Sequence, residues 1–316
     1  MSCRLCGDNS VSEHFTAQER LVGFGGSFDY SVCGACGSAQ ITEIPEDLGR
    51  YYAGGYYSFQ PPPNDRWPLG WLKRCRNAYE VFGAGVVGRR MDARAPNIYM
   101  RGLRTPGIDR NWRILDVGCG AGQHTSALGD IGFTRVTGTD PFIPEDIAYP
   151  NGVHIRKVGV EELEGQWDLV YLHHSFEHVP DPRATFASVS RLVAPGGWLV
   201  ISAPVFPNAA WERYGVHWVQ LDAPRHLTLP SERAIAALAR AAGLTMEAVE
   251  YNGNDFQFWG SEQYRHGLPL AKPGQRLYHP AAGLFTPKQM AEWRRQADRL
   301  NAEGLGDQAI FRMRAK

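Results

Sequence analysis

A glycine-rich turn near the middle of the chain constrains the fold more than any other feature. Residues 112–123 read Trp-Arg-Ile-Leu-Asp-Val-Gly-Cys-Gly-Ala-Gly-Gln, which predicts a short buried strand over 113–117, then a turn and a helix. Gly118, Gly120 and Gly122 let the backbone adopt positive φ and approach a ligand closely, and the helix start presents unpaired N–H groups. The pattern therefore predicts a nucleotide-like cofactor at this turn.

The spacing of these glycines separates two kinds of cofactor. The dinucleotide fingerprint is Gly-x-Gly-x-x-Gly, and Gln123 stands where that pattern wants its third glycine, which disfavours NAD. Asp116, directly before the turn, is placed to reach a cationic amino group. Residues 115–122 resemble motif I of the class I S-adenosylmethionine (SAM) methyltransferases. The cofactor contacts expected here are Asp116, Cys119 and the three glycines, although a lone cysteine such as Cys119 also packs well as a small apolar residue.

Strand and helix patterns alternate after the turn. Strands are predicted at 113–117, 135–139, 153–157, 167–172, 198–203, 245–252 and 307–313. This alternation predicts an α/β fold with a parallel, doubly wound sheet and a ligand at the C-terminal strand ends. The resemblance implies the Rossmann-like seven-stranded sheet of class I methyltransferases, with an antiparallel last strand. A helix is predicted between Leu221 and Leu244, with Ser231 as N-cap and Gly243 as its stop.

Length and linker composition suggest three parts. The 316 residues, 43% of them hydrophobic, suffice for one large domain and a smaller one. We expect a zinc-binding module at 1–50, a Tyr/Pro-rich linker and helical bridge at 51–111, and a methyltransferase domain at 112–316. Residues 255–305 would be an insertion before the last strand, with a solvated charged helix near 287–301. Without an apolar run of roughly 18 residues or a signal-peptide core, the sequence predicts no membrane span and a cytoplasmic location.

Four cysteines near the N-terminus form two Cys-x-x-Cys pairs, each followed by glycine: Cys3, Cys6, Cys33 and Cys36. Two tight knuckles of this kind donate four thiolates to one tetrahedral ion, which predicts structural Zn²⁺. Two disulfides, disfavoured in a cytoplasmic chain, and a rubredoxin-like iron site are the alternatives. A closed four-thiolate site leaves no position open for catalysis, so its role is to fold a segment too small to bury its own core.

Charge argues against a nucleic-acid partner. The formal net charge is +0, and residues 1–50 hold three arginines and no lysine against seven carboxylates, a net charge of −4. An acidic module is a poor phosphate binder. A zinc-module RNA methyltransferase is therefore kept only as an alternative, together with a non-catalytic SAM-binding protein. The sequence leaves the oligomeric state open.

Three further residues are expected to contact the cofactor. Asp140 ends the second strand, where a carboxylate can accept hydrogen bonds from both hydroxyls of a ribose. After the third strand, class I methyltransferases often carry an acidic residue near the adenine. This chain has Gly159-Val160-Glu161-Glu162 there, so the expected contact is made either by the backbone or by packing of Val160. His173, at the end of the fourth strand, completes the set.

The fourth strand ends in the richest chemical cluster, His173-His174-Ser-Phe-Glu177-His178. If the chain turns helical after 174, the side chains of His174, Glu177 and His178 share one face. They could hold a divalent ion, or one imidazole could act as general base. Similar Glu-x-x-Glu-His clusters hold a metal in ubiquinone O-methyltransferases and small-RNA 2′-O-methyltransferases, and here His174 replaces the first Glu. Alternatively, His178 only caps the loop over the cofactor.

Two aromatic stretches are candidates for the substrate site. Residues 211–226, after the fifth strand, combine tryptophans for stacking with charged groups for hydroxyls and phosphates. Paired tyrosines beside glycines, before Pro61, could form a flap over the site or pack an interdomain seam. The predicted substrate contacts are Tyr56, Tyr57, Trp218, Asp222 and Arg225.

A class I domain with a four-cysteine module resembles the methyltransferases of saccharide and nucleotide-sugar pathways. The resemblance implies methyl transfer from SAM to a sugar, nucleotide-sugar or saccharide hydroxyl or carbon, in polysaccharide biosynthesis. The implied mechanism is in-line displacement, with His178 and His226 as candidate bases. His174 and Glu177 would be their partners or would bind a second divalent metal. The expected partner is a small-molecule or saccharide substrate.

Overall fold

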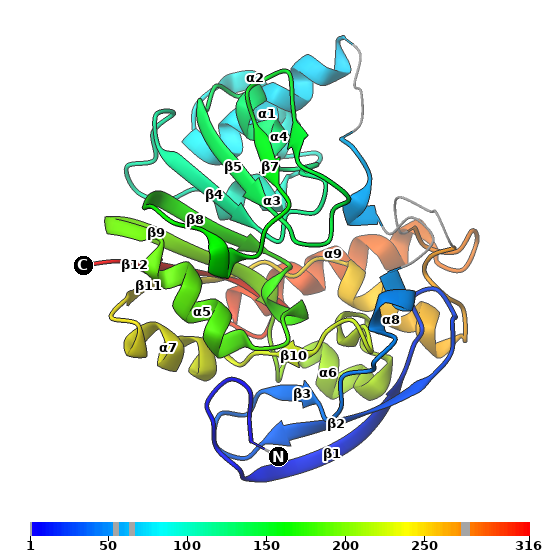
Figure 1. The fold of residues 1–316 in the computed structure, drawn as a ribbon. Helices are drawn as coiled ribbons and strands as arrows, with labels where there is room; N and C mark the ends of the chain where they lie inside the picture. Colours follow the sequence, from blue (N-terminus) through cyan, green and yellow to red (C-terminus); the bar gives the residue numbers. More distant parts are fainter. Residues whose placement is uncertain (1, 53–56, 63–66, 273–278) are drawn as a thin grey trace.

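The central sheet of the computed structural model confirms the expected α/β fold. The structure describes residues 2–52, 57–62, 67–272 and 279–316. Within these residues, eight strands follow the order β11-β12-β9-β8-β4-β5-β7-β6 (Figure 1). They are β4 (Arg113–Val117), β5 (Arg135–Thr139), β6 (Ile147–Ala148), β7 (His154–Arg156), β8 (Trp167–His173), β9 (Val193–Pro204), β11 (Thr245–Tyr251) and β12 (Gln308–Arg314).

The direction of the strands also agrees with the expectation. β4 is parallel to its neighbours β5 and β8, whereas β12 is antiparallel to both β9 and β11. The late last strand is therefore antiparallel, as the resemblance implies. The two-residue strand β6 is an addition at the edge, and β9 begins at Val193, five residues before the predicted 198.

Both faces of this sheet are buried, because successive side chains point to opposite sides. Ile114 and Leu169 pack on one face with α1 (Leu69–Phe82), α3 (Ile98–Gly102) and α4 (Ser126–Asp130). Leu115 and Val170 pack on the other with α5 (Pro182–Arg191) and α7 (Glu232–Ala241). The helical bridge expected before the sheet is thus α1, α2 (Val86–Asp92) and α3, and it covers one face.

The helix predicted from Leu221 is shorter than expected. The chain adopts φ 35° at Asp222, which an α-helix does not allow, and continues through β10 (Thr228–Leu229). The helix α7 begins only after Ser231, whose Oγ accepts a hydrogen bond from the N–H of Ala234 at 3.1 Å. The expected cap is therefore correct, and the segment before it is not helical.

A second sheet lies beside the first and pairs N-terminal strands with a short strand from the second half of the chain (Figure 1). It contains β1 (Val11–Gln18), β2 (Ser27–Cys33), β3 (Ala39–Ile41) and, as its last strand, β10. This sheet shares an apolar core with α6 (Ala209–Tyr214), α8 (Phe256–Arg265) and α9 (Pro287–Ala302). The charged helix α9 is mostly exposed, as expected, although it buries Trp293 and Ala297.

Short 3₁₀ turns connect these layers, at Leu48–Tyr52, Tyr57–Phe59, Val160–Glu162, Phe176–His178, Gly215–His217 and Val219–Leu221. Across the described ranges, every helix is too short or too polar to cross a bilayer.

The close contact between α3 and β8 gives a test of the fold. A Cβ added at Gly102 would lie 2.2 Å from the hydroxyl of the buried Tyr171, whereas one added at Gly49 would meet nothing within 4 Å. We expect Gly102→Ala to lower the free energy of unfolding by about 1–3 kcal/mol through overpacking. Gly49→Ala, the matched control, should change it by less than about 0.5 kcal/mol. Urea unfolding measures both, and equal midpoints would contradict this packing.

Candidate functional site

The glycine turn follows β4 as the sequence predicts. Gly118, Gly120 and Gly122 have φ of 72°, 57° and 75°. The carboxylate of Asp140, at the end of β5, accepts hydrogen bonds from the N–H of Gly120 at 2.8 Å and of Phe142 at 2.9 Å. A buried carboxylate therefore lies directly beside the turn, and its burial raises the pKa of Asp140.

Asp116 is buried behind the turn. One of its oxygens, Oδ2, accepts hydrogen bonds from the hydroxyls of Tyr99 and Thr125, both at 2.6 Å. Burial raises the pKa of Asp116 to about 6, which the two hydroxyl donors only partly offset. Asp116, predicted to contact the cofactor, is therefore held by hydrogen-bond donors of the protein itself.

Part of the tyrosine-rich segment covers the turn. The carbonyl of Ser58 accepts a hydrogen bond from the N–H of Ala121 at 2.8 Å, and that of Gln60 accepts one from the side chain of Gln123 at 2.9 Å. A Cβ at Gly120 would lie 2.2 Å from the carbonyl oxygen of Ser58, so this approach requires glycine. The predicted contact Tyr56 lies outside the described residues, and Tyr57 opens the 3₁₀ turn that carries Ser58.

The remaining predicted cofactor contacts lie around the same strand ends. Cys119 is half-buried and packs against the backbone of Gly138, where a Cβ would come within 2.5 Å of its sulfur. Val160 is buried in the core below. His173 ends β8 with its Nδ1 2.9 Å from the hydroxyl of Tyr171, and burial lowers the pKa of His173 well below its usual value.

The loop after β8 does not form the expected helix. His174 adopts φ 49°, which ends regular structure, and only a 3₁₀ turn follows at Phe176–His178. The condition under which three side chains would share one helical face is therefore not met. His174 nevertheless donates a hydrogen bond from Nδ1 to Oε1 of the completely buried Glu177 at 3.1 Å.

The two candidate bases meet in space although they are far apart in the sequence. The ring centroids of His178 and His226 are 4.8 Å apart. His226 Nδ1 donates to the carbonyl of Gln220 at 2.7 Å, and its Nε2 lies 3.9 Å from carboxylate oxygens of both Glu177 and Asp222. Because Nδ1 carries the proton, Nε2 of His226 is the acceptor in the neutral ring.

The protonation of this cluster follows from its burial. Burial opposes the charge of Glu177, but the hydrogen bond from His174 and the two other nearby imidazoles lower its pKa to about 2. Burial, reinforced by the neighbouring His226, lowers the pKa of His178 to about 4. The cluster thus combines an ionised carboxylate with a neutral imidazole at pH 7. Glu177 Oε2 has no hydrogen-bond donor among the described residues.

Sequence reasoning did not single out Tyr52 as a neighbour of His178. The hydroxyl of Tyr52 lies 3.0 Å from Nδ1 of His178. The carbonyl of Arg225 lies 2.9 Å from the same nitrogen, so Nδ1 of His178 donates and its Nε2 is the acceptor. The repeated tyrosine pairs were the sequence signal that pointed to this segment. The prediction used the second pair, Tyr56 and Tyr57, instead of the first, which contains Tyr52.

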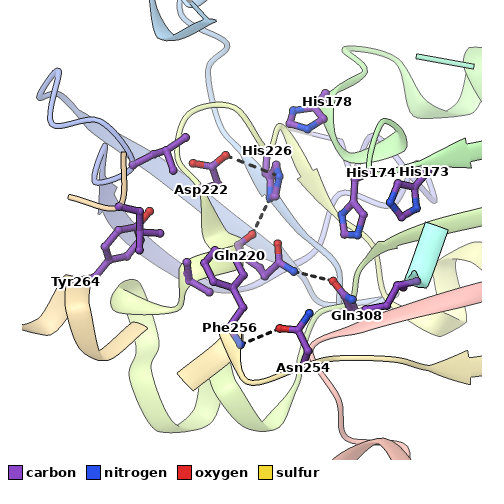
Figure 2. Close-up of a pocket in the computed structure, with 14 residues that line it drawn as sticks. His173, His174, His178, Gln220, Asp222, His226, Asn254, Phe256, Tyr264 and Gln308 are labelled. Carbon is purple, nitrogen blue, oxygen red and sulfur yellow. Dashed lines mark hydrogen bonds and ion pairs between the residues drawn. The ribbon is translucent and has the colours of Figure 1, made fainter. Parts of the chain in front are cut away.

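A cavity of ≈ 260 Å³ opens beside the histidines (Figure 2). Gln220, Asn254 and Gln308, none of them predicted, supply amide groups to its lining, and Gln220 donates to Gln308 at 2.9 Å. Asn254 and Gln308 flank the segment predicted as an insertion. The full lining is Leu21, Ile98, His173, His174, His178, Val219, Gln220, Asp222, His226, Asn254, Phe256, Tyr264, Leu270 and Gln308.

Among the three substrate contacts predicted in the loop after β9, only Asp222 lines this cavity. Trp218 is completely buried and donates from its indole to Asp307 at 3.2 Å. Arg225 is also completely buried and bonds to Asp222, Glu19 and the carbonyl of Tyr51. We therefore correct the assignments of Trp218 and Arg225, because their functional groups are committed within the protein core.

The four predicted metal ligands converge. Cys3 and Cys36 have sulfurs 3.6 Å apart, and those of Cys6 and Cys33 are 3.5 Å apart. All four sulfurs lie within 4.8 Å of one another. Tetrahedral zinc with Zn–S bonds near 2.3 Å needs sulfurs roughly 3.8 Å apart, whereas a disulfide needs about 2.05 Å. The cluster therefore fits one four-thiolate ion. Glu177, His178 and His226 form a second group with metal-ligand spacing.

Comparison with known proteins identifies similar sequences. A family model described as "Methyltransferase domain" matches residues 88–249, just over half of the chain. The chain is 37% identical over 166 residues to a ubiquinone biosynthesis O-methyltransferase of Bordetella avium, covering 44% of this chain and 66% of that protein. A protein of the same name from Thiobacillus denitrificans is 36% identical over 159 residues, covering 43% and 66%. The chain thus spans just under two thirds of the length of these relatives.

Solved structures resemble the chain at lower identity. A complex of the Haloferax volcanii Trm112 methyltransferase activator with a methyltransferase matches with 18% identity and a TM-score of 0.48, covering 76% of this chain and 97% of that one. Magnesium protoporphyrin IX methyltransferase of Synechocystis PCC 6803, with bound SAH, matches with 13% identity and a TM-score of 0.44, covering 86% and 100%.

The partner of Trp218 gives a pH-dependent prediction. Burial raises the pKa of Asp307 to about 7, although the indole donor opposes the shift. The folded protein therefore holds a proton that the unfolded chain releases near pH 4, so this group's stabilisation is present at low pH and is lost as pH rises through about 7. In the parent protein this group lowers the free energy of unfolding by up to about 1.4 kcal/mol for each unit of rising pH, and we expect Asp307→Asn to remove that dependence.

Urea unfolding between pH 5 and 8 tests this prediction. The exposed Glu43→Gln is the control and should keep the slope of the parent protein. An Asp307→Asn variant whose stability falls with pH as steeply as that of the parent would show that Asp307 is ionised in the folded protein.

Proposed function

We propose that this chain, which belongs to the methyltransferase-domain family, moves a methyl group from SAM to a hydroxyl oxygen of a small acceptor. One observation carries the proposal. His226 has its Nδ1 committed to the carbonyl of Gln220, and its Nε2 accepts in the neutral ring that lines the cavity. An imidazole held in one tautomer beside an acceptor cavity can take the proton of a hydroxyl.

The residues at the strand ends fit the cofactor. A Cβ at Gly118 would lie 2.5 Å from that of Ser175, so the backbone here forms a cradle that only glycine allows. Asp140 offers carboxylate oxygens beside this cradle for ribose hydroxyls, and Asp116 lies below it for an amino group. When bound, SAM supplies a methyl group already activated by its sulfonium charge. The chain then needs to orient the acceptor and remove one proton.

Three acidic or imidazole groups support the base. The carboxylates of Glu177 and Asp222, each 3.9 Å from Nε2 of His226, stabilise the positive charge that the ring gains with the proton. His178 packs edge to face against the same ring and restricts its orientation. His226 therefore combines access, tautomer and charge stabilisation, which makes it the stronger of the two candidate bases.

The acceptor that we propose is a neutral molecule with hydroxyl groups. The cavity presents amides from Gln220, Asn254 and Gln308 beside the apolar faces of Phe256 and Tyr264. Both a saccharide hydroxyl and a phenol suit such a lining. The names of the relatives refer to ubiquinone biosynthesis and to O-methylation, so they give no support to polysaccharide biosynthesis. They favour oxygen over carbon as the methylated atom and a phenol as the second candidate acceptor. Release of SAH with hexoses and with catechol, both neutral at pH 7, compares the two.

Crossed measurements on two variants test the assignment. Asp140→Ala should weaken SAH binding by about a hundredfold, because two charge-assisted hydrogen bonds are lost. His226→Ala should leave SAH affinity within about twofold and lower kcat by about 10²–10⁴-fold. Calorimetry measures the first quantity and single-turnover kinetics the second, with the exposed His14→Ala as control. Normal turnover in His226→Ala would overturn the base assignment.

Metal content is the second test. Native mass spectrometry should show one zinc ion per chain that is lost in Cys36→Ser and retained in Cys75→Ser, because Cys75 lies outside the four-thiolate cluster. Oε2 of Glu177, which has no hydrogen-bond donor among the described residues, suits a divalent ion held together with His178 and His226. A second ion that disappears in Glu177→Gln would replace the metal-free mechanism by one in which Glu177, His178 and His226 hold a metal. A chain without zinc would contradict the four-thiolate site.

A further inference from the structure

One short segment, residues 225–231, lies between the four-cysteine module and the histidine cluster and contacts both. The N–H of Leu227 donates to the carbonyl of Glu177 at 2.8 Å, and the carbonyl of Leu227 accepts from the N–H of Ile41 at 3.0 Å. The next two residues pair with Gln40 and Ala39 as β10 against β3. The backbone that carries His226 is therefore hydrogen-bonded to the cluster on one side and to the module on the other.

The side chain of Arg225, the residue before His226, is held by hydrogen bonds to the N-terminal module. The guanidinium of Arg225 donates to Glu19 at 2.8 Å, and both side chains are completely buried. The carboxylate of Glu19 also accepts from three consecutive backbone N–H groups, at 3.0, 2.8 and 2.7 Å, in the turn between β1 and β2. A buried ion pair tolerates little displacement, because separating it leaves uncompensated charge in the core. This pair fixes Arg225 to the N-terminal sheet.

Three further hydrogen bonds tie the same segment to the module. The hydroxyl of the buried Tyr30, on β2, donates to the carbonyl of His226 itself at 2.9 Å. At the other end, the hydroxyl of Ser231 donates to the carbonyl of Cys36, a member of the four-cysteine cluster, at 2.6 Å. The N–H of Ser231 also donates to Ser38, whose own neighbour is the sulfur of Cys36 at 3.3 Å. The second cysteine knuckle thus lies within one hydrogen bond of the segment.

We propose that the four-cysteine module is the positioning element of the acceptor site, and that it sets the orientation of the His226 imidazole. The role of that imidazole as base rests on the proposed function above, whereas its placement does not. Tyr30 and Glu19 are then positioning residues that act through the backbone of His226 and through Arg225. The cofactor turn lies between β4 and β5, whose ladders run to β8 and β7. Disturbing the module should therefore change the acceptor reaction and spare cofactor affinity.

The test uses Tyr30→Phe in the full, zinc-loaded chain, because this change removes one hydroxyl and leaves the four thiolates intact. Tyr214→Phe is the matched control, since Tyr214 is a buried tyrosine of the same core whose hydroxyl contacts Glu262 instead. Modification of His226 by diethyl pyrocarbonate, followed by peptide mass spectrometry, reports the exposure of the ring, with the exposed His154 as internal reference. SAH calorimetry and steady-state kinetics with the acceptor complete the set.

In Tyr30→Phe we expect His226 to react several-fold faster and kcat to fall by about tenfold, because small displacements of a catalytic group are costly. The affinity for SAH should stay within about twofold, and the Tm should match that of Tyr214→Phe. Removal of zinc by a chelator should increase the labelling of His226 in the same direction.

Unchanged labelling of His226 in both Tyr30→Phe and the metal-free chain would overturn the proposal, whatever the kinetics show. A loss of SAH affinity in step with kcat would also overturn it, because the effect would then be general loosening. Faster labelling without methyl transfer to any acceptor would instead sink the proposed function and leave the positioning role standing.

Discussion

A completely buried carboxylate, that of Glu177, imposes the arrangement of the whole site. Removing a charge from water is costly unless nearby groups compensate it. Its own loop supplies only part of that compensation, through His174 at 3.1 Å. His226, which belongs to a distant segment, also brings its Nε2 to 3.9 Å from the same carboxylate. The burial of one charge therefore requires two separate parts of the chain to meet.

This requirement explains why the two sheets share a boundary. The end of β8 belongs to the parallel sheet, whereas the strand after His226 belongs to the N-terminal sheet (Figure 1). Leu227 bridges them, because its N–H donates to the loop that follows β8 and its carbonyl accepts from Ile41 of β3. An isolated four-cysteine module would bury little core of its own, and here it completes that core with helices from residues 209–302. The same apolar core thus stabilises both the four-cysteine module and the histidine site.

The sequence predicted what depends on local pattern. The strands of the central sheet and the parallel direction of most of them followed from apolar runs alternating with helices, and the cap at Ser231 followed from its residue type. Contacts between residues that are far apart in the sequence were not predictable in the same way. Arg225 and Trp218 have the composition of a sugar site, but their partners Glu19 and Asp307 are far away in the sequence, so burial could not be read from the segment. A helical face at 174–178 failed because positive φ at His174 has no clear sequence signal.

The hydrogen-bond direction of the cavity lining restricts the acceptor. Gln308 donates to the carbonyl of Asn252 and accepts from the amide nitrogen of Gln220, so the side-chain oxygen of Gln220 ends this amide chain without a donor among the residues that the structure describes. Nε2 of His226 and the carboxylate of Asp222 add further acceptors to the same cavity. No lysine or arginine belongs to the lining among the described residues, because Arg225 is turned into the core. A diphosphate would therefore meet carboxylate without a cation, whereas a neutral hydroxyl compound can donate to each of these groups. For the acceptor that we propose, the lining thus favours an unphosphorylated compound over a nucleotide-linked one, and the ion pair that keeps Arg225 out of the cavity also fixes the segment that carries His226.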